Sequence, residues 1–553
     1  CFIVAAEDSL DSLINVWAEV ARISRAGGGV GVNLSRIRAN GSWVGGVPNV
    51  AGGVTGWIRI LNDIAVAVNQ GGKRAGAVTV SLDMWHLDIP EFLELQTENG
   101  DQRRKAYDIF PQVVIPDLFM ERVCANQHWT LVDPYEVRQE LGFELAELWG
   151  EAFEKAYGEV EAAAAKGRLR LVQTWSAREL YLRVLRTLVE TGMPYQAFKD
   201  TINAANPNAH DGYIPGVNLC VESFSNVQPH TLVHVCNLMS LNLARAQEQT
   251  LETSTRLAIR MLDNAIELTE PPIPGAKNHN QRYRTVGLGI MGLADWLARR
   301  HLPYTQVAEA EALMERIAYT AFQENISLGL ERGSYPAWAG SPLSKGIVFG
   351  RVFVGRRSLA LADIQKRLGQ EAAQRAVADR RYRLELIEAA EQHQLSVVEG
   401  RLDWDGIVAG LGRAARCSQL LAIAPNSSTS LLQGCTASYL PVYARLFMDQ
   451  NGKGAVPIVP PYLQQAFWYY VENKTLDQNI VVNMTAALQR WVDTGISMEL
   501  LFNLNIEQYR DVRYILRTFV SAWRQKVKAI YYVRWIQRDQ TRSEFSECSV
   551  CAN

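Results

Sequence analysis

The sequence predicts an α/β protein built as one large unit. Short apolar runs of strand character alternate with amphipathic stretches at helical spacing, which is the pattern of this fold class. Hydrophobic residues make up 48% of the 553 residues and charged residues 21%, so a large core is possible. At about 150 residues per domain the length allows three or four domains. No Pro/Ser-rich linker and no fixed-period repeat marks a boundary between them.

The composition excludes several classes of protein. The 56 Lys and Arg against 58 Asp and Glu give a formal net charge of −2, without the basic excess of a general nucleic-acid binder. No apolar run approaches the roughly 18 residues of a membrane span. The 8 cysteines are too few for a disulfide scaffold of this length.

The first 82 residues predict a strand, a helix, a second helix and a second strand. The strand predicted at 2–5 is apolar throughout. The helix predicted at 9–24 has an apolar face, and Asp8 or Ser9 is its N-cap. Glycines at 27–31 permit close backbone approach or positive φ. The later elements are a helix at 54–69, a basic Gly-rich loop at 69–76 and a buried strand at 77–82.

Further helices are predicted at about 139–165, 176–191, 230–247 and 252–268. Residues 356–399 are rich in Arg, Ala, Glu and Gln, which indicates a helical surface insertion at about 346–400. Polar residues 537–547 predict a flexible tail.

Asn218, Cys220 and Glu222 alternate along the chain and would project to one side of an extended loop. An amide, a thiol and a carboxylate together provide a hydrogen-bond donor, a sulfur centre and a base. Cys236 follows sixteen residues after Cys220. Taken alone, this segment also fits a buried cysteine in a strand flanked by solvated polar groups.

The tail carries the C-x-x-C pair of this sequence, Cys548 and Cys551. A zinc site would need a second close pair or a His partner, and the sequence has neither. A dithiol on a flexible tail can exchange with a disulfide elsewhere, because thiolate attack needs access and reach. The alternative is a chain end whose cysteines have no role.

Two other segments allow both a functional and a structural interpretation. Residues 425–430 form a Ser-rich turn entering a helix, which suits a phosphate group or a simple helix cap. Tyr531 and Tyr532 lie in an apolar strand, where adjacent tyrosines also occur by chance.

These motifs, taken in order, resemble the catalytic (large, α) subunit of ribonucleotide reductase. The finger loop of that family is similar to 218–222 followed by 236–238. The resemblance covers most of the chain and is weakest over 346–400. It also includes the segments 8–11, 27–31, 33–38, 70–74, 84–87, 272–277, 285–289, 425–430, 531–532 and 548–551.

The resemblance implies a ten-stranded α/β barrel of two antiparallel halves, with the finger loop through its centre. The barrel is expected to span 1–536, with the helical insertion at about 346–400, and to be followed by a redox-active tail at 537–553.

The resemblance also implies roles in the reduction of ribonucleotides, expected to be diphosphates, to 2′-deoxyribonucleotides. Cys220 would carry the thiyl radical, Glu222 would take the 3′-hydroxyl proton, and Asn218 would bind the substrate hydroxyls. The cysteines expected to reduce the 2′ position are Cys1 and Cys236, and those expected to re-reduce them are Cys548 and Cys551.

The same resemblance also implies which residues bind substrate and effector. Gly28 and Gly29 would let the backbone approach the substrate, and Asp8, Arg38 and Arg74 would bind or report a dNTP or ATP effector. The substrate phosphate residues would be Pro425, Asn426, Ser427, Ser428 and Thr429.

The radical would come from a separate metal-containing β subunit through Tyr531 and Tyr532. This chain itself would then hold no metal and no tightly bound cofactor. The alternative is an adenosylcobalamin-dependent reductase, for which the sequence shows no cobalamin site. Expected partners are the β subunit, thioredoxin or glutaredoxin and a second copy paired through helices 9–24 and 54–69, with no nucleic acid or membrane. Catalytic thiols favour the reducing cytoplasm.

The start at Cys1 departs from the family, whose members have a helical region and often an ATP-binding cone ahead of this point. We therefore consider the hypothesis of a fragment, such as one produced by an intein. Two other functions remain open: a non-catalytic effector-binding fragment, and a thiol–disulfide oxidoreductase that uses only Cys548 and Cys551.

Overall fold

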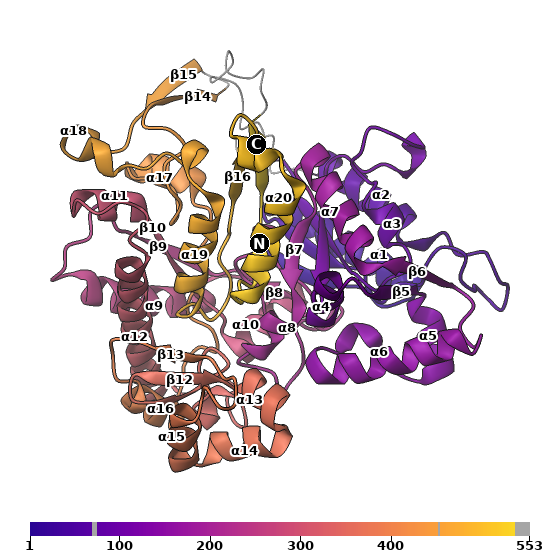
Figure 1. The fold of residues 1–553 in the computed structure, drawn as a ribbon, viewed down its shortest axis with the longest axis horizontal. Helices are drawn as coiled ribbons and strands as arrows, with labels where there is room; N and C mark the ends of the chain where they lie inside the picture. The colour runs from indigo at the N-terminus through magenta and orange to yellow at the C-terminus, as the bar shows by residue number, and fades with distance from the viewer. Residues whose placement is uncertain (69–74, 452–453, 537–553) are drawn as a thin grey trace.

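A computed structural model describes residues 1–68, 75–451 and 454–536 (Figure 1). One sheet has seven strands in the order β8-β1-β2-β3-β4-β7-β17, all of them from the first 235 residues except β17. The five central strands are parallel, and the edge strands β8 and β17 are antiparallel to their neighbours. The bounds are β1 Phe2–Ala5, β2 Val30–Asn33, β3 Val78–Asp83, β4 Ile109–Ile115, β7 Tyr195–Phe198, β8 His234–Val235 and β17 Ala529–Ile530.

The two faces of this sheet pack against different partners, as β1 shows. Phe2 and Val4 belong to the large core shared with helices such as α1 (Leu10–Arg25) and α2 (Gly53–Ala67), which lie beside the sheet in Figure 1. Ile3 and Ala5 belong to a second cluster with residues of the 215–224 loop. Because side chains alternate along a strand, an all-apolar strand can serve both faces.

A second group of strands lies on the far side of that loop. β9 (Leu238–Asn242) pairs in parallel with β10 (Gly287–Met291), and single parallel bridges continue the ladder from Leu288 to Leu421 and from Ile423 to Ile496. β16 (Leu500–Asn503) pairs in parallel with β18 (Val533–Ile536). The α/β class expected from the sequence is confirmed.

The remaining elements cover the two strand groups or connect them. The short strand pairs are β5 His128–Val132 with β6 Val172–Ser176, and β14 Phe447–Asn451 with β15 Gly454–Ile458. The other helices are α3 Ile89–Phe92, α4 Asp117–Ala125, α5 Pro134–Leu141, α6 Gly150–Ala165, α7 Ala177–Thr191, α8 Lys199–Ala204, α9 Leu251–Leu268, α10 Pro274–Tyr283, α11 Leu293–Arg299, α12 Val307–Arg332, α16 Asp405–Leu411, α17 Ser427–Gln433, α18 Leu463–Ala466, α19 Gln478–Gln489 and α20 Val512–Arg524.

Two helix predictions need correction. The predicted helix 230–247 is wrong, since this segment forms β8 and β9. Its apolar residues pair with β1 and β10, and this tertiary pairing overrides a pattern that is compatible with a helix. The predicted helix 139–165 is interrupted after α5, where Gly142 adopts φ +77° and ends the helix.

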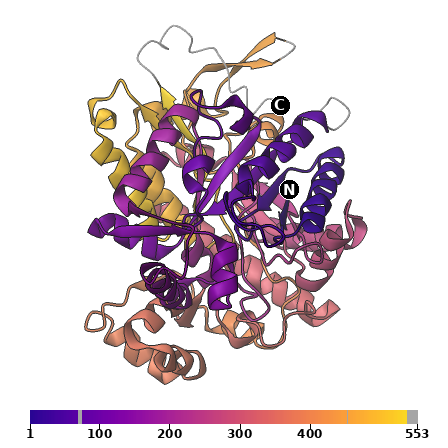
Figure 2. The same ribbon diagram turned by 90° about the vertical axis from the view of Figure 1, so that its right-hand side faces the viewer.

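Residues 346–400 contain three strands in addition to the expected helices. The strands β11 (Arg351–Val354), β12 (Arg357–Ala360) and β13 (Val397–Glu399) form an antiparallel sheet. The helices, which lie at the lower end of the molecule in Figures 1 and 2, are α13 Leu361–Leu368, α14 Gln370–Ala378 and α15 Arg380–Glu388. Their apolar residues form a core of their own around Ile364 and Leu386, so this segment is more than a helical surface addition.

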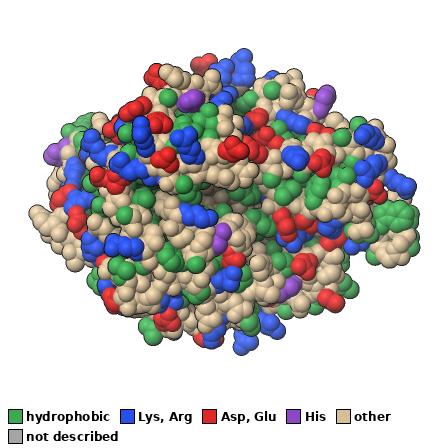
Figure 3. Space-filling model, turned by 90° about the horizontal axis from the view of Figure 1, so that it is seen from below, with side chains coloured by type: hydrophobic (Ala, Val, Ile, Leu, Met, Phe, Trp, Pro, Cys, Tyr) green, Lys and Arg blue, Asp and Glu red, His purple; other side chains and the backbone are tan. Residues whose placement is uncertain are grey.

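Within the described ranges no helix is both long and apolar enough to cross a bilayer. On the face shown in Figure 3, Lys and Arg side chains lie among Asp and Glu side chains, as the balanced composition predicts.

Candidate active site

The loop 215–224, called the finger loop below, is held between the two strand groups. On the side of the first sheet, the Asn33 amide nitrogen Nδ2 donates to the Pro215 carbonyl at 3.1 Å. On the opposite side, the Gly495 backbone N–H donates to the Glu222 carbonyl at 2.7 Å, and the Ser497 hydroxyl donates to the Cys220 carbonyl at 2.6 Å. Both ends of the loop are therefore fixed by hydrogen bonds to its backbone carbonyls.

The finger loop turns where the sequence predicts an extended segment. The Val221 N–H donates to the Asn218 carbonyl at 3.1 Å, and Val221 adopts φ +60°. This turn brings the Asn218 Nδ2 to 2.9 Å from the Glu222 Oε1 and to 3.5 Å from the Cys236 Sγ. The Asn218 and Glu222 side chains meet, but through a turn rather than through strand alternation.

Glu222 is buried, with only 1% of its surface exposed. Its Oε2 has no hydrogen-bond partner among the described residues. Burial, followed by the nearby Cys220 and Cys236 thiols, raises the pKa of Glu222 well above its ordinary value. A carboxylate in these surroundings is a stronger base than one in water.

Cys220 lies next to a cluster of tyrosines. The Tyr531 hydroxyl donates to the Cys220 Sγ at 3.6 Å. The Tyr531 and Tyr532 ring centroids are 4.2 Å apart, and the buried Tyr195 ring lies 4.8 Å from Tyr531 and 5.2 Å from Tyr532. Burial raises the pKa of Tyr531 and of Tyr195 well above 10, so both phenols keep their protons.

Cys1 and Cys236 lie opposite each other at the edge of the sheet. The Cys236 N–H donates to the Cys1 carbonyl at 2.9 Å, next to the antiparallel pair Phe2 and Val235. Residues paired in this way have Cα atoms about 5.5 Å apart, which is within the range that a disulfide bridges. Among the described cysteines none is joined in a disulfide.

Burial opposes ionisation of the Cys236 thiol, whereas its contacts with His234 and Ser223 lower the pKa of Cys236.

Comparison with known proteins shows the family of this chain. A family model described as the ribonucleotide reductase barrel domain matches residues 1–533. The chain belongs to the ribonucleotide reductase family. The α subunit of ribonucleoside-diphosphate reductase from Synechocystis sp. is 52% identical, over 100% of this chain and 68% of that protein. The corresponding subunit from Helicobacter pylori strain J99 is 30% identical over 97% of this chain and 70% of its own length, and that from Treponema pallidum is 32% identical over 100% and 62%.

The residues expected to bind substrate phosphate in this ribonucleotide reductase surround the start of α17. Asn426 precedes the helix with φ +58°, and its Nδ2 donates to the Ser240 hydroxyl at 3.1 Å. Ser428 and Thr429 are exposed. The first amides of a helix lack partners within it and so remain available to an anion. The phosphate role of Pro425, Asn426, Ser427, Ser428 and Thr429 stays a prediction.

The glycines at 28 and 29 are required by packing, not by positive φ. A Cβ on Gly29 would lie 2.5 Å from the Leu219 Cδ2 and 3.3 Å from the Cys1 Sγ. A Cβ on Gly28 would lie 2.7 Å from a ring carbon of Phe2. Gly29 therefore allows β2 to approach the finger loop, and its contact with substrate stays a prediction.

Two of the predicted effector residues contact each other. The Arg38 Nε donates to both carboxylate oxygens of Asp8 at 3.1 Å, and the Arg138 Nη2 lies 2.5 Å from the same carboxylate. The Arg38 guanidinium also stacks 4.3 Å from the Tyr135 ring centroid. Arg74, Cys548 and Cys551 lie outside the described residues, so the structure does not place them.

The sequence reasoning missed several residues of the site. Tyr195, Ser223 and His234 contact the predicted residues, but no local pattern distinguishes them. Lys528 is buried and donates to the carbonyls of 492–494, next to the Gly495 that holds Glu222. The sequence signal that could have identified this residue was a charged Lys at the start of the apolar stretch that leads to Tyr531.

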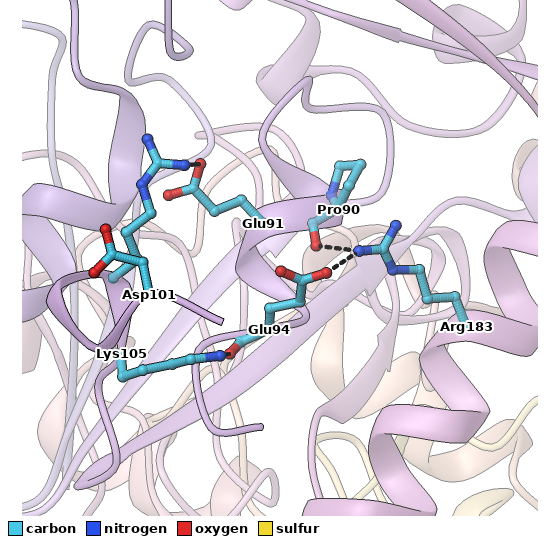
Figure 4. A pocket seen from close by; sticks show the side chains of 7 residues that line it. Pro90, Glu91, Glu94, Asp101, Lys105 and Arg183 are labelled. Carbon is cyan, nitrogen blue, oxygen red and sulfur yellow. Dashed lines mark hydrogen bonds and ion pairs between the residues drawn. The ribbon is translucent and has the colours of Figure 1, made fainter. Parts of the chain in front are cut away.

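The pocket in Figure 4 has a volume of about 200 Å³ and is formed by residues outside the finger loop. Two pairs of its charges are joined, Arg104 with Glu91 at 3.1 Å and Arg183 with Glu94. In the described part of the chain no group of three or more His, Cys, Asp or Glu side chains is arranged to hold a metal ion.

Proposed function

We propose that this chain is the catalytic subunit of a ribonucleoside-diphosphate reductase and uses Cys220 as its radical centre. The observation that carries the proposal is the contact between the Tyr531 hydroxyl and the Cys220 Sγ at 3.6 Å, beside Glu222 and Cys236. A phenol, a thiol, a buried carboxylate and a second thiol lie close together here, between the two strand groups.

In the proposed reaction the Cys220 thiyl takes the 3′ hydrogen of the ribose, and Glu222 accepts the 3′-hydroxyl proton. Asn218 orients the substrate hydroxyls. The 2′ hydroxyl leaves as water, while Cys1 and Cys236 supply two electrons and two protons and form a disulfide. Cys220 then returns the hydrogen to the 3′ carbon. The sum is one ribonucleotide and two thiols converted to one deoxyribonucleotide, one disulfide and one water.

The tyrosines support delivery of the radical from outside this chain. The contacts run from Tyr532 to Tyr531 and from Tyr531 to Cys220. Because Tyr531 carries a proton, its oxidation moves an electron and a proton together. We assign the origin of the radical to a metal-containing β subunit, and an adenosylcobalamin-dependent start is the alternative.

The other partners follow from the chemistry. A dithiol protein such as thioredoxin or glutaredoxin would reduce the tail cysteines, and a dNTP or ATP effector would bind near Asp8 and Arg38. A homodimer would pair α1 and α2 of two copies. Catalytic thiols favour a reducing compartment, the cytoplasm.

The test is turnover of a ribonucleoside diphosphate by Cys220→Ser with a β subunit and a dithiol reductant. The exposed Cys124→Ser is the matched control. We expect Cys220→Ser to lose turnover and keep nucleotide binding, and Cys124→Ser to keep both. Turnover by Cys220→Ser would reject the proposal. Turnover of the unmodified chain with adenosylcobalamin and no β subunit would favour the alternative radical source.

A further inference from the structure

The Cys236 thiol has a histidine and a serine beside it that the proposed reaction does not use. His234 Nε2 lies 3.9 Å from the Cys236 Sγ and 2.8 Å from the Ser223 hydroxyl oxygen. Ser223 is held in place because its backbone N–H donates to the Asn218 Oδ1 at 3.1 Å. All three residues therefore depend on the finger loop and on β8.

His234 is buried, with 1% of its surface exposed. Its Nδ1 has no hydrogen-bond partner among the described residues, so its known polar contacts are made through Nε2. The His279 ring packs against it edge-on, with centroids 5.0 Å apart. Burial and the neighbouring His234 lower the pKa of His279, which leaves an uncharged ring beside His234.

A histidine with these contacts can exchange a proton with the thiol. A serine hydroxyl can donate or accept, so Ser223 keeps its hydrogen bond whether Nε2 is protonated or not. When Nε2 is protonated it donates to Ser223, and the serine proton can then be directed to a Cys236 thiolate. The other titratable groups near Cys236 are Cys1, which is paired with it, and Glu222, which both Cys236 and Cys220 influence.

We propose that His234, supported by Ser223, is the proton acceptor and donor for Cys236 as the Cys1–Cys236 disulfide is formed and reduced. The inference rests on the proposed function and adds a residue to it. It also assigns different roles to the two sulfurs, with Cys1 attacked and Cys236 leaving.

The Cys1–Cys236 disulfide is reduced in two exchange steps. In the first, the thiolate of a dithiol reductant bonds to the Cys1 sulfur, and the Cys1–Cys236 bond breaks with its electron pair on Cys236. Cys236 takes a proton from His234. The second thiol of the reductant, after losing its proton, attacks the mixed disulfide, so that the reductant is oxidised to a disulfide and Cys1 leaves and is protonated. A thiolate that is better stabilised leaves faster, which favours Cys236 in this role.

The experiment measures the alkylation rate of Cys236 by iodoacetamide, quantified by peptide mass spectrometry from about pH 5 to 9, a range that spans imidazole and thiol titrations. The variant is His234→Gln, which keeps hydrogen-bonding atoms and cannot titrate. His128→Gln is the matched control, since His128 is exposed on β5. All variants share the same residue 1, so any effect of that residue on Cys236 is the same in each.

We expect the pH at which Cys236 is alkylated at half its maximal rate to rise by about one unit or more in His234→Gln. Below this midpoint, alkylation would then be about tenfold slower than in the parent chain. Ser223→Ala is the second variant and should shift the midpoint in the same direction. Unchanged midpoints in both, with thermal unfolding like that of the parent chain, would overturn the inference. The measurement needs no turnover, so it is separate from the Cys220→Ser test: loss of the proposed function would leave the alkylation result intact.

Discussion

Gly31→Ala should damage catalysis far more than folding, because Gly31 is where the first sheet touches the finger loop. Gly31 sits in β2 between Ile3 of β1 and Thr79 of β3. A Cβ at this position would lie 2.6 Å from the Val217 carbonyl oxygen and 3.4 Å from the Asn218 Cα. Ordinary C···O contacts are about 3.3–3.6 Å.

The loop must therefore move by about 0.7 Å or more, since β2 is held by ladders on both sides and cannot retreat. A displacement of about 1 Å at reacting groups costs about 100-fold in rate. The strain itself should cost about 1–3 kcal/mol of stability. We thus expect turnover to fall by about two orders of magnitude while the protein stays folded.

The assay is steady-state ribonucleotide reduction together with thermal unfolding. Gly158→Ala is the matched control, because a Cβ there meets nothing within 4 Å in the middle of α6. This control should keep full turnover and gain about 0.5–1 kcal/mol of stability from better helix propensity. Parent-like turnover in Gly31→Ala would refute the reasoning that the β2 contact positions the loop.

Three further predictions concern other contacts of the site and core. Tyr531→Phe removes the hydroxyl that contacts Cys220, so turnover should fall to background while alkylation of Cys220 continues. Retained turnover would exclude this phenol from the radical route. The pKa of Glu222 is raised above 4.5, so its carboxylate becomes protonated and is lost as a base as the pH falls through that higher value. Turnover should therefore decline on the acid side, and Glu222→Gln should turn over slowly without that decline. A pH profile of Glu222→Gln that matches the parent would contradict the assignment. Lys199→Met leaves the carboxylate of Asp83 buried and unpaired, which should lower the free energy of unfolding, measured with denaturant, by about 3–5 kcal/mol. Lys366→Met at the surface should lower it by at most about 1 kcal/mol. Equal losses in the two variants would show that the buried pair contributes no more than the surface pair.

Local sequence was sufficient for much of the secondary structure. The strand at 2–5 and the helices near 9–24 and 54–69 have apolar spacing, caps or glycine ends that act over a few residues, and the structure reproduces them closely. The prediction failed at 230–247, where the apolar residues are used for strand pairing with partners distant in the sequence. Such pairing leaves no local signature.

For the candidate site too, some features could be predicted from neighbouring residues in the sequence and others could not. The short motif around Cys220 named Asn218 and Glu222 because all three residues are close in the chain, and the family resemblance added Cys1, Cys236 and the tyrosines. The sequence could not show that Val221 takes a left-handed turn, which is what brings the amide to the carboxylate. A strand-like alternation and a tight turn are equally compatible with these residue types.

What the sequence by itself determined is the fold class and the strand and helix positions with local signals, and it supplied the candidates for the reactive side chains. Only the tertiary structure decided which of them touch: Tyr531 reaches Cys220 from 311 positions away along the chain, and Ser223 of the finger loop reaches His234 of β8. The physical reason is that composition and spacing act along the chain. Distances between reacting atoms depend instead on how two strand groups close around one loop.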